Sequence, residues 1–406
     1  MKKRSPGSRS DALEVHLAEF LATLATAGYA NTTQDDKRRL LVPFIGWARG
    51  AQLAAADLDE ACVVAFLAQP SPQRRRTRDM QRVTLQQFLE HLRAGGTVAQ
   101  RRATEQSAAD ALVQRYLEYL RRDRGLCSRS VDVYSPFAQA FVVAQRLPER
   151  VASLDASAIR AYLLGCSRNR SSSFVKLFAA ALRSFLRFLF LDGPTPADLS
   201  TAVPPIRRWR LAAVPPFLTP DEVQRVIAAT DRSTTSGCRA HAMLLLLAKL
   251  GLRAGEVATL ELDDICWAAG EIVVRGKGRL RDRLPLLDDV GEALALYLRE
   301  ARGPSSSRRV FLRRCAPHLG LSGPTAVCRV ARAAIRRAAL LPDGRVGAHV
   351  FRHSLATRMI RHGASLPEIA QVLRHRSIDT TQLYAKVEFE ALGGVALPWP
   401  STEIQQ

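Results

Sequence analysis

Apolar residues recur at helical spacing through the first half of the chain. Residues three or four positions apart share one face of an α-helix, so stripes of this kind predict amphipathic helices. Two clear stripes are Leu17, Phe20, Leu21 and Leu24, and Leu85, Phe88, Leu89 and Leu92. The pattern predicts small helical bundles with one buried and one solvated face per helix.

The two halves of this region also resemble each other at an offset of 96 or 97 residues. Apolar positions correspond along the whole length, and two glycines of the first half each have a counterpart in the second, as Gly28 matches Gly125 and Gly96 matches Gly193. A fixed offset of this kind indicates an internal repeat, although coincidental helix amphipathicity remains open. We therefore expect two helical units, residues 1–100 and 101–203.

The pattern changes after the segment PPIRRWRLAAVPP, in which two Pro-Pro pairs bracket an arginine-rich stretch. This composition predicts a stiff linker over residues 204–216. Thr219-Pro220-Asp221-Glu222 is typical of a helix start, with a cap, an early proline and acids at the positive end of the dipole. A buried helix is expected around His241–Leu250. Strands at Glu271–Val274 and Arg283–Leu286 would form a hairpin with the basic tip GKGRLRD. Further helices are expected at 290–300, 325–340, 348–361, 366–373 and 380–387.

The charge of the chain narrows the class of partner. The 406 residues include 59 Lys+Arg against 38 Asp+Glu, a formal charge of +21. Only seven of the basic residues are lysines, which a GC-rich genome would explain, but codon bias does not explain the shortage of acids. A folded chain with this excess favours a polyanionic partner, above all double-stranded DNA. The 47% hydrophobic fraction excludes a disordered or fibrous protein.

The seven cysteines are scattered and never form CxxC, which fits neither a disulfide framework nor a zinc site and is typical of a reducing compartment. The N-terminus does not resemble a signal peptide. The longest apolar runs fall far short of the roughly 20 residues that span a bilayer. We expect a cytoplasmic, nucleoid-associated protein.

Candidate chemistry concentrates between residues 348 and 385. His349 and Arg352 stand at i and i+3 and so share a helix face. His375 and Tyr384 follow in the next segments. Histidine and arginine can bind the non-bridging oxygens of a phosphate, and a tyrosine hydroxyl can attack phosphorus. A phenol of pKa about 10 needs surrounding cations to act as a nucleophile.

Two basic residues upstream extend this set. Arg253 stands between two glycines, after the buried helix and before a new one, where it could clamp a phosphate. Lys277 stands at the hairpin tip in RGKGR. Lysine can give up its proton and arginine cannot, so a general acid in this arginine-rich chain would have to be lysine.

In order and spacing, Arg253 in GLRAGE, Lys277, His349-x-x-Arg352, His375 in LRH and Tyr384 resemble the catalytic set of the tyrosine recombinase (phage integrase) family. The resemblance is strong over residues 216–390 and weaker over 107–200, which is similar to the family's helical core-binding domain. It implies a mainly α fold with a small β component. SAM-like helical bundle domains would precede a mixed α/β catalytic domain at 217–390, and a tail at 391–406 would follow.

The resemblance implies a role for each residue. Tyr384 would attack the scissile phosphodiester to form a 3′-phosphotyrosine, while Arg253 and Arg352 neutralise the transition state. Lys277 would protonate the leaving 5′ oxygen.

Three further side chains would support these groups. His349 would transfer a proton or bind phosphate, His375 would donate to a non-bridging oxygen, and Glu256 would support the site. No metal, ATP or other cofactor is needed, because the phosphotyrosine retains the energy of the broken bond.

The implied function is site-specific recombination for integration, excision or transposition of a mobile element. The family works as a homo-tetramer on DNA, with or without sister recombinases, and its tail often packs on a neighbouring subunit. Further DNA contacts are expected from arginines of the linker and hairpin, namely Arg207, Arg208, Arg210, Arg279 and Arg281. Two alternatives stay open, a type IB topoisomerase-like relaxing enzyme and a catalytically silent DNA-binding protein of the same fold.

Two positions depart from the family pattern. Arg374 stands where a glycine commonly precedes the second histidine, and Lys386 stands where a histidine often follows the tyrosine. Both leave the catalytic groups in place. His349 and His353 could instead be metal ligands, but the sequence offers no acid or cysteine at matching spacing. We expect His353 to pack in the core.

Overall fold

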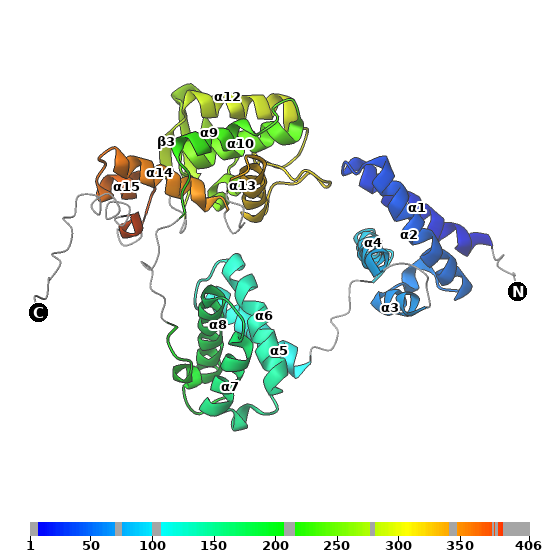
Figure 1. The fold of residues 1–406 in the computed structure, drawn as a ribbon. Coiled ribbons are helices and arrows are strands. Elements are labelled where there is room, and N and C mark those ends of the chain that lie inside the picture. Colours follow the sequence, from blue (N-terminus) through cyan, green and yellow to red (C-terminus); the bar gives the residue numbers. More distant parts are fainter. Residues whose placement is uncertain are drawn as a thin grey trace, which may run out of the picture. The chain divides into compact units, whose positions relative to one another are not determined.

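The computed structural model describes residues 7–69, 75–99, 107–206, 216–276, 281–340, 347–375, 377 and 381–384. Over these ranges α-helices dominate and a single small sheet is present (Figure 1). The expected fold class, mainly α with a small β component, is confirmed. Most of the expected linker, the tail 391–406 and half of the expected helix 380–387 lie outside the described residues, and the described part of that helix holds only a short 3₁₀ turn, Gln382–Tyr384.

In its described part, the first helical unit contains the α-helices α1 (Gly7–Thr26), α2 (Asn31–Gly50), α3 (Glu60–Ala68) and α4 (Arg75–Ala94). The two predicted stripes lie on α1 and α4 and supply much of one hydrophobic core. At its centre the rings of Phe20 and Phe88 meet edge to face with centroids 5.6 Å apart, the geometry that aromatic quadrupoles favour.

The second unit contains α5 (Ala108–Arg122), α6 (Ser128–Gln145), α7 (Ala156–Ser167) and α8 (Ser172–Leu191) around a core of its own (Figure 1). In that core the rings of Tyr116 and Phe185 also meet edge to face, with centroids 4.9 Å apart.

Equivalent features of the two units recur at the offset seen in the sequence. Asp59 caps α3 and Asp155 caps α7, each through a carboxylate that accepts a backbone N–H three residues on. Gly28 and Gly125 both lie in the short connection that follows a helix and adopt the left-handed conformation, with φ of 82° and 58°. The order of helices is the same in both units.

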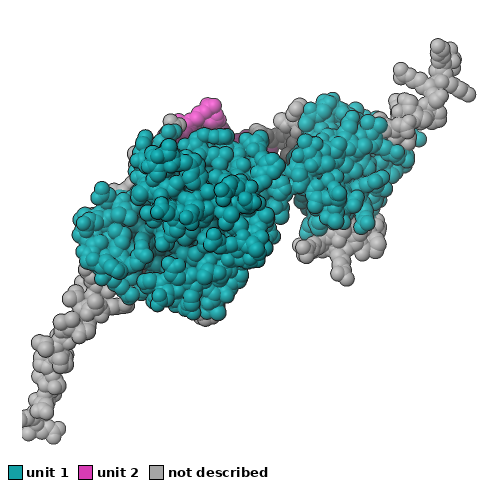
Figure 2. Space-filling model, turned by 90° about the horizontal axis from the view of Figure 1, so that it is seen from above, with its two compact units in different colours: residues 1–98, 211–406 teal, residues 99–210 magenta. Residues whose placement is uncertain are grey.

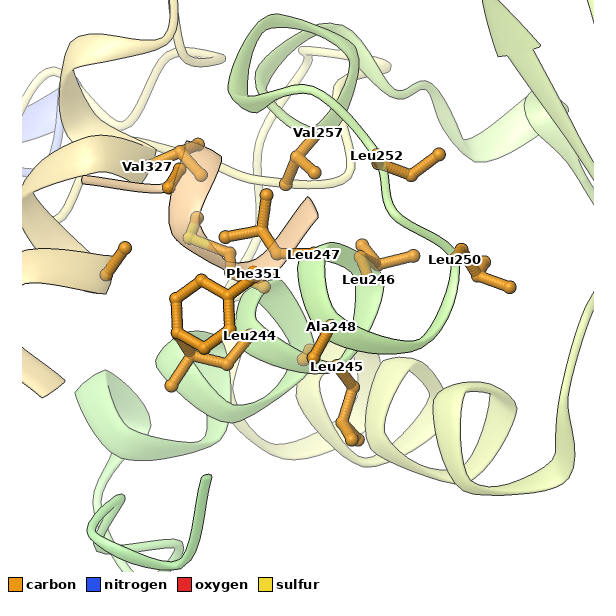
Figure 3. Close-up of a cluster of buried hydrophobic side chains, with 14 of the residues drawn as sticks. Leu244, Leu245, Leu246, Leu247, Ala248, Leu250, Leu252, Val257, Val327 and Phe351 are labelled. Carbon is orange, nitrogen blue, oxygen red and sulfur yellow. The ribbon is translucent and has the colours of Figure 1, made fainter. Parts of the chain in front are cut away.

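The C-terminal half is built around α10 (Thr235–Lys249), which is preceded by α9 (Pro220–Ala228) and followed by α11 (Ala254–Thr259). The side chains of Leu244–Leu247 are all buried, so α10 is covered on every side, as expected for a central helix. Figure 3 shows them among Val257 of α11, Val327 and Phe351.

The predicted hairpin is present as β2 (Glu271–Arg275) and β3 (Arg281–Pro285), antiparallel and paired from Glu271↔Pro285 to Arg275↔Arg281. Alternate residues of β2 are buried, so one face of the sheet covers the core. A third strand that the sequence did not predict, β1 (Ile265–Cys266), pairs with β2. Two residues are too few to carry a periodic signal.

Two helices complete this core. They are α12 (Asp288–Leu296), whose last turn widens into a π-helix at Tyr297–Ala301, and α13 (Thr325–Arg337). After them, α14 (His349–Arg361) and α15 (Leu366–Val372) enclose a smaller apolar cluster. Tyr384 belongs to this cluster, and the short turn Gln382–Tyr384 positions it against α14. The helices expected at 348–361 and 366–373 are therefore confirmed.

By compactness the chain divides into residues 99–210 and the remainder, 1–98 with 211–406 (Figure 2). Among the described helices, none is long and apolar enough to cross a membrane.

Candidate active site

The site begins at the turn between α10 and α11. Gly251 adopts a left-handed conformation with φ 57°, and a Cβ there would lie 2.9 Å from terminal methyl groups of Leu355 and Leu373. The turn therefore needs glycine both for its backbone conformation and for close packing. Arg253 follows as the residue that precedes α11, which places its guanidinium at the end of the central helix.

Arg253 is held mainly by Glu256, one turn into α11. The Glu256 carboxylate accepts the backbone N–H of Arg253 at 2.8 Å and its Nη1 at 2.7 Å. The second nitrogen, Nη2, donates to the backbone carbonyl of Arg374 at 3.1 Å. The Arg253 side chain keeps 37% exposure, whereas that of Glu256 keeps 6%. The guanidinium is thus fixed on its protein side and open on the other.

Glu256 is a buried carboxylate among arginines. Burial by itself raises its pKa, but the hydrogen bond from the Arg253 backbone and the charges of Arg374 and Arg253 outweigh burial, so that the pKa is lowered. Glu256 is therefore ionised at neutral pH and can hold two cations.

Arg352 lies in the first turn of α14 and is almost fully buried, at 4% exposure. Its Nη1 donates to the Gly251 carbonyl at 2.5 Å, and its Nη2 donates to the Leu373 carbonyl. Burial and the neighbouring guanidinium of Arg253 lower the pKa of Arg352 to about 9, so it keeps its charge at neutral pH. Backbone carbonyls hold this cation without neutralising it.

Tyr384 is buried at 2% exposure, and its hydroxyl is hydrogen-bonded to Nδ1 of His353 at 2.8 Å. The expectation that His353 merely packs in the core was wrong, because it is half-buried and contacts the tyrosine hydroxyl directly. His349 lies one turn earlier on α14, with ring centroids 6.3 Å apart. The sequence signal was the i, i+4 spacing of the two histidines, which put both on the face that meets Tyr384.

His375 follows α15 and lies with its ring parallel to that of Tyr384, with centroids 6.3 Å apart. Its Nδ1 is hydrogen-bonded to the Thr381 hydroxyl at 2.7 Å, which fixes the ring. This places the second histidine beside the tyrosine, although nine residues separate them in sequence.

Burial and nearby cations set the charge states around the tyrosine. Burial, His349 and Arg352 lower the pKa of His353 to about 4, and burial, Arg352 and Arg253 lower that of His375 to about 4. Burial raises the pKa of Tyr384 to about 12, although Arg352 and Arg253 oppose it. At neutral pH the tyrosine is a protonated phenol beside two neutral imidazoles that can accept a proton.

Of the eleven residues singled out from the sequence, the structure brings together Arg253, Arg352, His349, His375 and Tyr384. Arg281 is exposed on β3. Lys277, Arg207, Arg208, Arg210 and Arg279 lie outside the described residues.

Comparisons with known proteins point to one family. The sequence model of the phage integrase family matches residues 216–391. The chain is 37% identical over 390 residues to y4rA of Sinorhizobium fredii, whose name describes an integrase/recombinase, with 95% of this chain and 94% of that protein covered. It is 29% identical over 287 residues to the tyrosine recombinase XerD of Listeria monocytogenes serotype 4b, with 68% and 94% covered.

Among solved structures, a crystal structure of a lambda integrase tetramer bound to a Holliday junction is similar, with a TM-score of 0.52 and 18% identity. The likeness covers 83% of this chain and 92% of that one. At this identity it indicates a shared fold.

Proposed function

Because this chain belongs to the phage integrase family of tyrosine recombinases, enzymes that cleave and rejoin DNA, we propose that Tyr384 is its nucleophile and forms a 3′-phosphotyrosine at specific DNA sites. Family membership, which the resemblance in the sequence predicted, is confirmed. The observation that carries the assignment of Tyr384 is its position beside His353 and His375 and within the field of Arg352 and Arg253.

The proposed reaction is a transesterification, in which one bond from phosphorus to oxygen replaces another. The Tyr384 oxygen forms a bond to phosphorus as the bond from phosphorus to the 5′ oxygen breaks, and the phenolic proton passes to a base. His353 is the base in contact, since it is neutral at neutral pH and already hydrogen-bonded to the hydroxyl. Attack by a 5′-hydroxyl on the phosphotyrosine reverses the step and rejoins the strand.

Arg253 and Arg352 would stabilise the extra negative charge that phosphorus carries in the transition state. Both are fixed before substrate arrives, which is the condition under which electrostatic stabilisation costs no reorganisation. His375 and His349 would bind the same phosphate as hydrogen-bond donors.

Lys277 would protonate the leaving 5′ oxygen. This assignment rests on its motif position and on the capacity of lysine to transfer a proton. Lys277→Ala should cleave an ordinary substrate slowly and regain activity on a substrate with a 5′-thiolate leaving group, which needs no acid. A variant that stays slow on the thiolate would remove Lys277 as the acid.

The buried state of Tyr384 implies a closed resting site. At 2% exposure, its hydroxyl must become accessible before a phosphodiester can reach it. We propose that DNA binding provides the energy for this opening through contacts with the arginines of the linker and hairpin, among them the exposed Arg281.

We further propose that the helical units, residues 1–100 and 101–203, and the arginines of the linker and hairpin hold duplex DNA, and that four copies assemble on two sites. Support comes from the charge of +21 and from the lambda integrase tetramer on a Holliday junction, which shares the fold. Integration, excision or transposition of a mobile element is the role that fits the similarity to y4rA. Such an enzyme would act in the cytoplasm on the nucleoid.

The test uses a suicide substrate, from which the short fragment with the 5′-hydroxyl diffuses away after cleavage. Religation is then impossible, so the covalent protein–DNA adduct accumulates. Wild-type protein should form an adduct, whereas Tyr384→Phe should bind the same DNA and form none. Tyr297→Phe is the matched control, because Tyr297 is a buried tyrosine that stacks on Phe311 in the larger apolar cluster, and not in the one that holds Tyr384. An adduct in Tyr384→Phe would overturn the assignment.

A further inference from the structure

Arg374 occupies a backbone position that favours glycine. Its φ is 54°, in the left-handed region that strains a residue with a side chain. It lies directly before His375 and after the end of α15. A long, charged residue at such a position is expected only where its side chain makes contacts that offset the strain.

The Arg374 side chain is buried against Glu256. Its Nη2 donates to Glu256 Oε2 at 2.9 Å, and the two side chains are 8% and 6% exposed. Its Nε is buried with no hydrogen-bond partner among the described residues, and it lies 3.9 Å from Oδ2 of Asp282 on β3, whose side chain is 43% exposed. Its backbone carbonyl accepts Nη2 of Arg253. Arg374 thus contacts Arg253 through its backbone and the partner of Arg253 through its side chain.

This arrangement divides one carboxylate between two arginines. Glu256 Oε1 binds Arg253 and Oε2 binds Arg374. If Arg374 were absent, the charge of Glu256 would cancel that of Arg253 alone. With Arg374 present, the side chains of Arg253, Arg374 and Glu256 together carry one net positive charge. That charge faces outward on the exposed side of the Arg253 guanidinium.

We propose that Arg374 is a positioning residue that neutralises Glu256 and orients Arg253, so that the full charge of Arg253 is available to the scissile phosphate. The inference rests on the proposed function, in which Arg253 stabilises that phosphate. Arg374 itself does not touch the substrate.

The test compares Arg374→Gly with wild type on two suicide substrates, one with an ordinary scissile phosphate and one with a neutral methylphosphonate there. Glycine suits the left-handed backbone, so the variant should fold while losing only the guanidinium. At saturating DNA we expect adduct formation on the phosphate to fall by about 10- to 100-fold. On the methylphosphonate, which is neutral before attack and carries one negative charge fewer in the transition state, the loss should shrink to about threefold or less.

Two further variants sharpen the result. Arg374→Lys keeps the charge and should recover most of the rate. Ala339→Gly is the matched control, because Ala339 also has a left-handed backbone, at φ 53°, and is exposed. It should leave both rates unchanged.

The outcomes separate the two proposals. Equal losses on both substrates would mean a merely structural role and would overturn the inference, as would a wild-type rate in Arg374→Gly. No adduct from wild-type protein on the ordinary phosphate, or an adduct from Tyr384→Phe, would instead overturn the proposed function.

Discussion

The turn at Gly251, which supports the candidate site, should be sensitive to a single added methyl group. Gly251→Ala must place a Cβ on a backbone with φ 57°, 2.9 Å from the terminal carbons of Leu355 and Leu373. The carbonyl of the same residue accepts Nη1 of Arg352. The substitution therefore strains the backbone, crowds the cluster around Tyr384 and shifts a ligand of the buried arginine.

The expected loss of stability follows from the first two of these effects, backbone strain and crowding. The left-handed conformation costs alanine about 1–2 kcal/mol, and overpacking costs about 1–3 kcal/mol. Because both contacting atoms are far ends of leucine side chains, which can move, we expect a total of about 3 kcal/mol. This is less than the stability of an ordinary domain, about 5–15 kcal/mol, so the variant should stay folded.

The assay is hydrogen exchange of the intact protein, followed by mass spectrometry on peptides from α10 and α14. A loss of about 3 kcal/mol corresponds to roughly 100-fold faster exchange of amides that exchange through opening of this domain. Peptides from α5–α8, in the other compact unit, serve as the internal reference.

Gly255→Ala is the matched control, because it adds the same methyl group four residues on, inside α11. Among the described atoms nothing lies within 4 Å of a Cβ there. Alanine in a helix is about 0.5–1 kcal/mol better than glycine, so exchange should slow. Equal effects at both positions, or unchanged exchange in Gly251→Ala, would refute the packing argument.

Three further outcomes are expected. His353→Phe should keep a ring of similar size and still bind DNA, but form the covalent adduct at least about 100-fold more slowly. The rate of adduct formation should then rise with pH toward the pKa of the tyrosine. A pH profile like that of the wild type would exclude His353 as the base. The free energy of unfolding should fall as the pH drops from about 6.5 to about 4, by up to about 3 kcal/mol for His353. The reason is that His353 binds a proton more weakly in the folded protein than in the unfolded chain. Thermal unfolding measured against pH should show a smaller dependence in His353→Gln, and an unchanged dependence would contradict this. DNA affinity should fall steeply with salt, and Arg281→Ala should reduce the slope of log K against log salt by about one; an unchanged slope would mean that Arg281 meets no phosphate.

The helical units and the central helix could be predicted because their signals are local. The stripe at Leu85, Phe88, Leu89 and Leu92 is buried as its spacing predicts. The start of α9 carries the predicted cap, with Thr219 and Glu222 bonded to each other's backbone. Short elements escaped, as β1 did, because two residues cannot display a period.

The side-chain contacts of the candidate site could not be predicted from the sequence. The sequence predicted that His353 packs in the core, whereas its Nδ1 meets a hydroxyl 31 residues away. It marked Arg374 only as a departure from a family pattern, with no indication that its guanidinium reaches Glu256, 118 residues away. Side-chain direction and pairing at such separations depend on how helices pack.

The sequence by itself therefore determined the class of protein, the order of its elements and the residue types of the site, because periodicity, capping and motif spacing are written along the chain. Only the tertiary structure decided that one carboxylate is shared by Arg253 and Arg374 and that Tyr384 rests buried against His353. These contacts form where α10, α11, α14 and α15 pack together. Packing fixes the direction and the partners of buried side chains, which the sequence pattern does not determine.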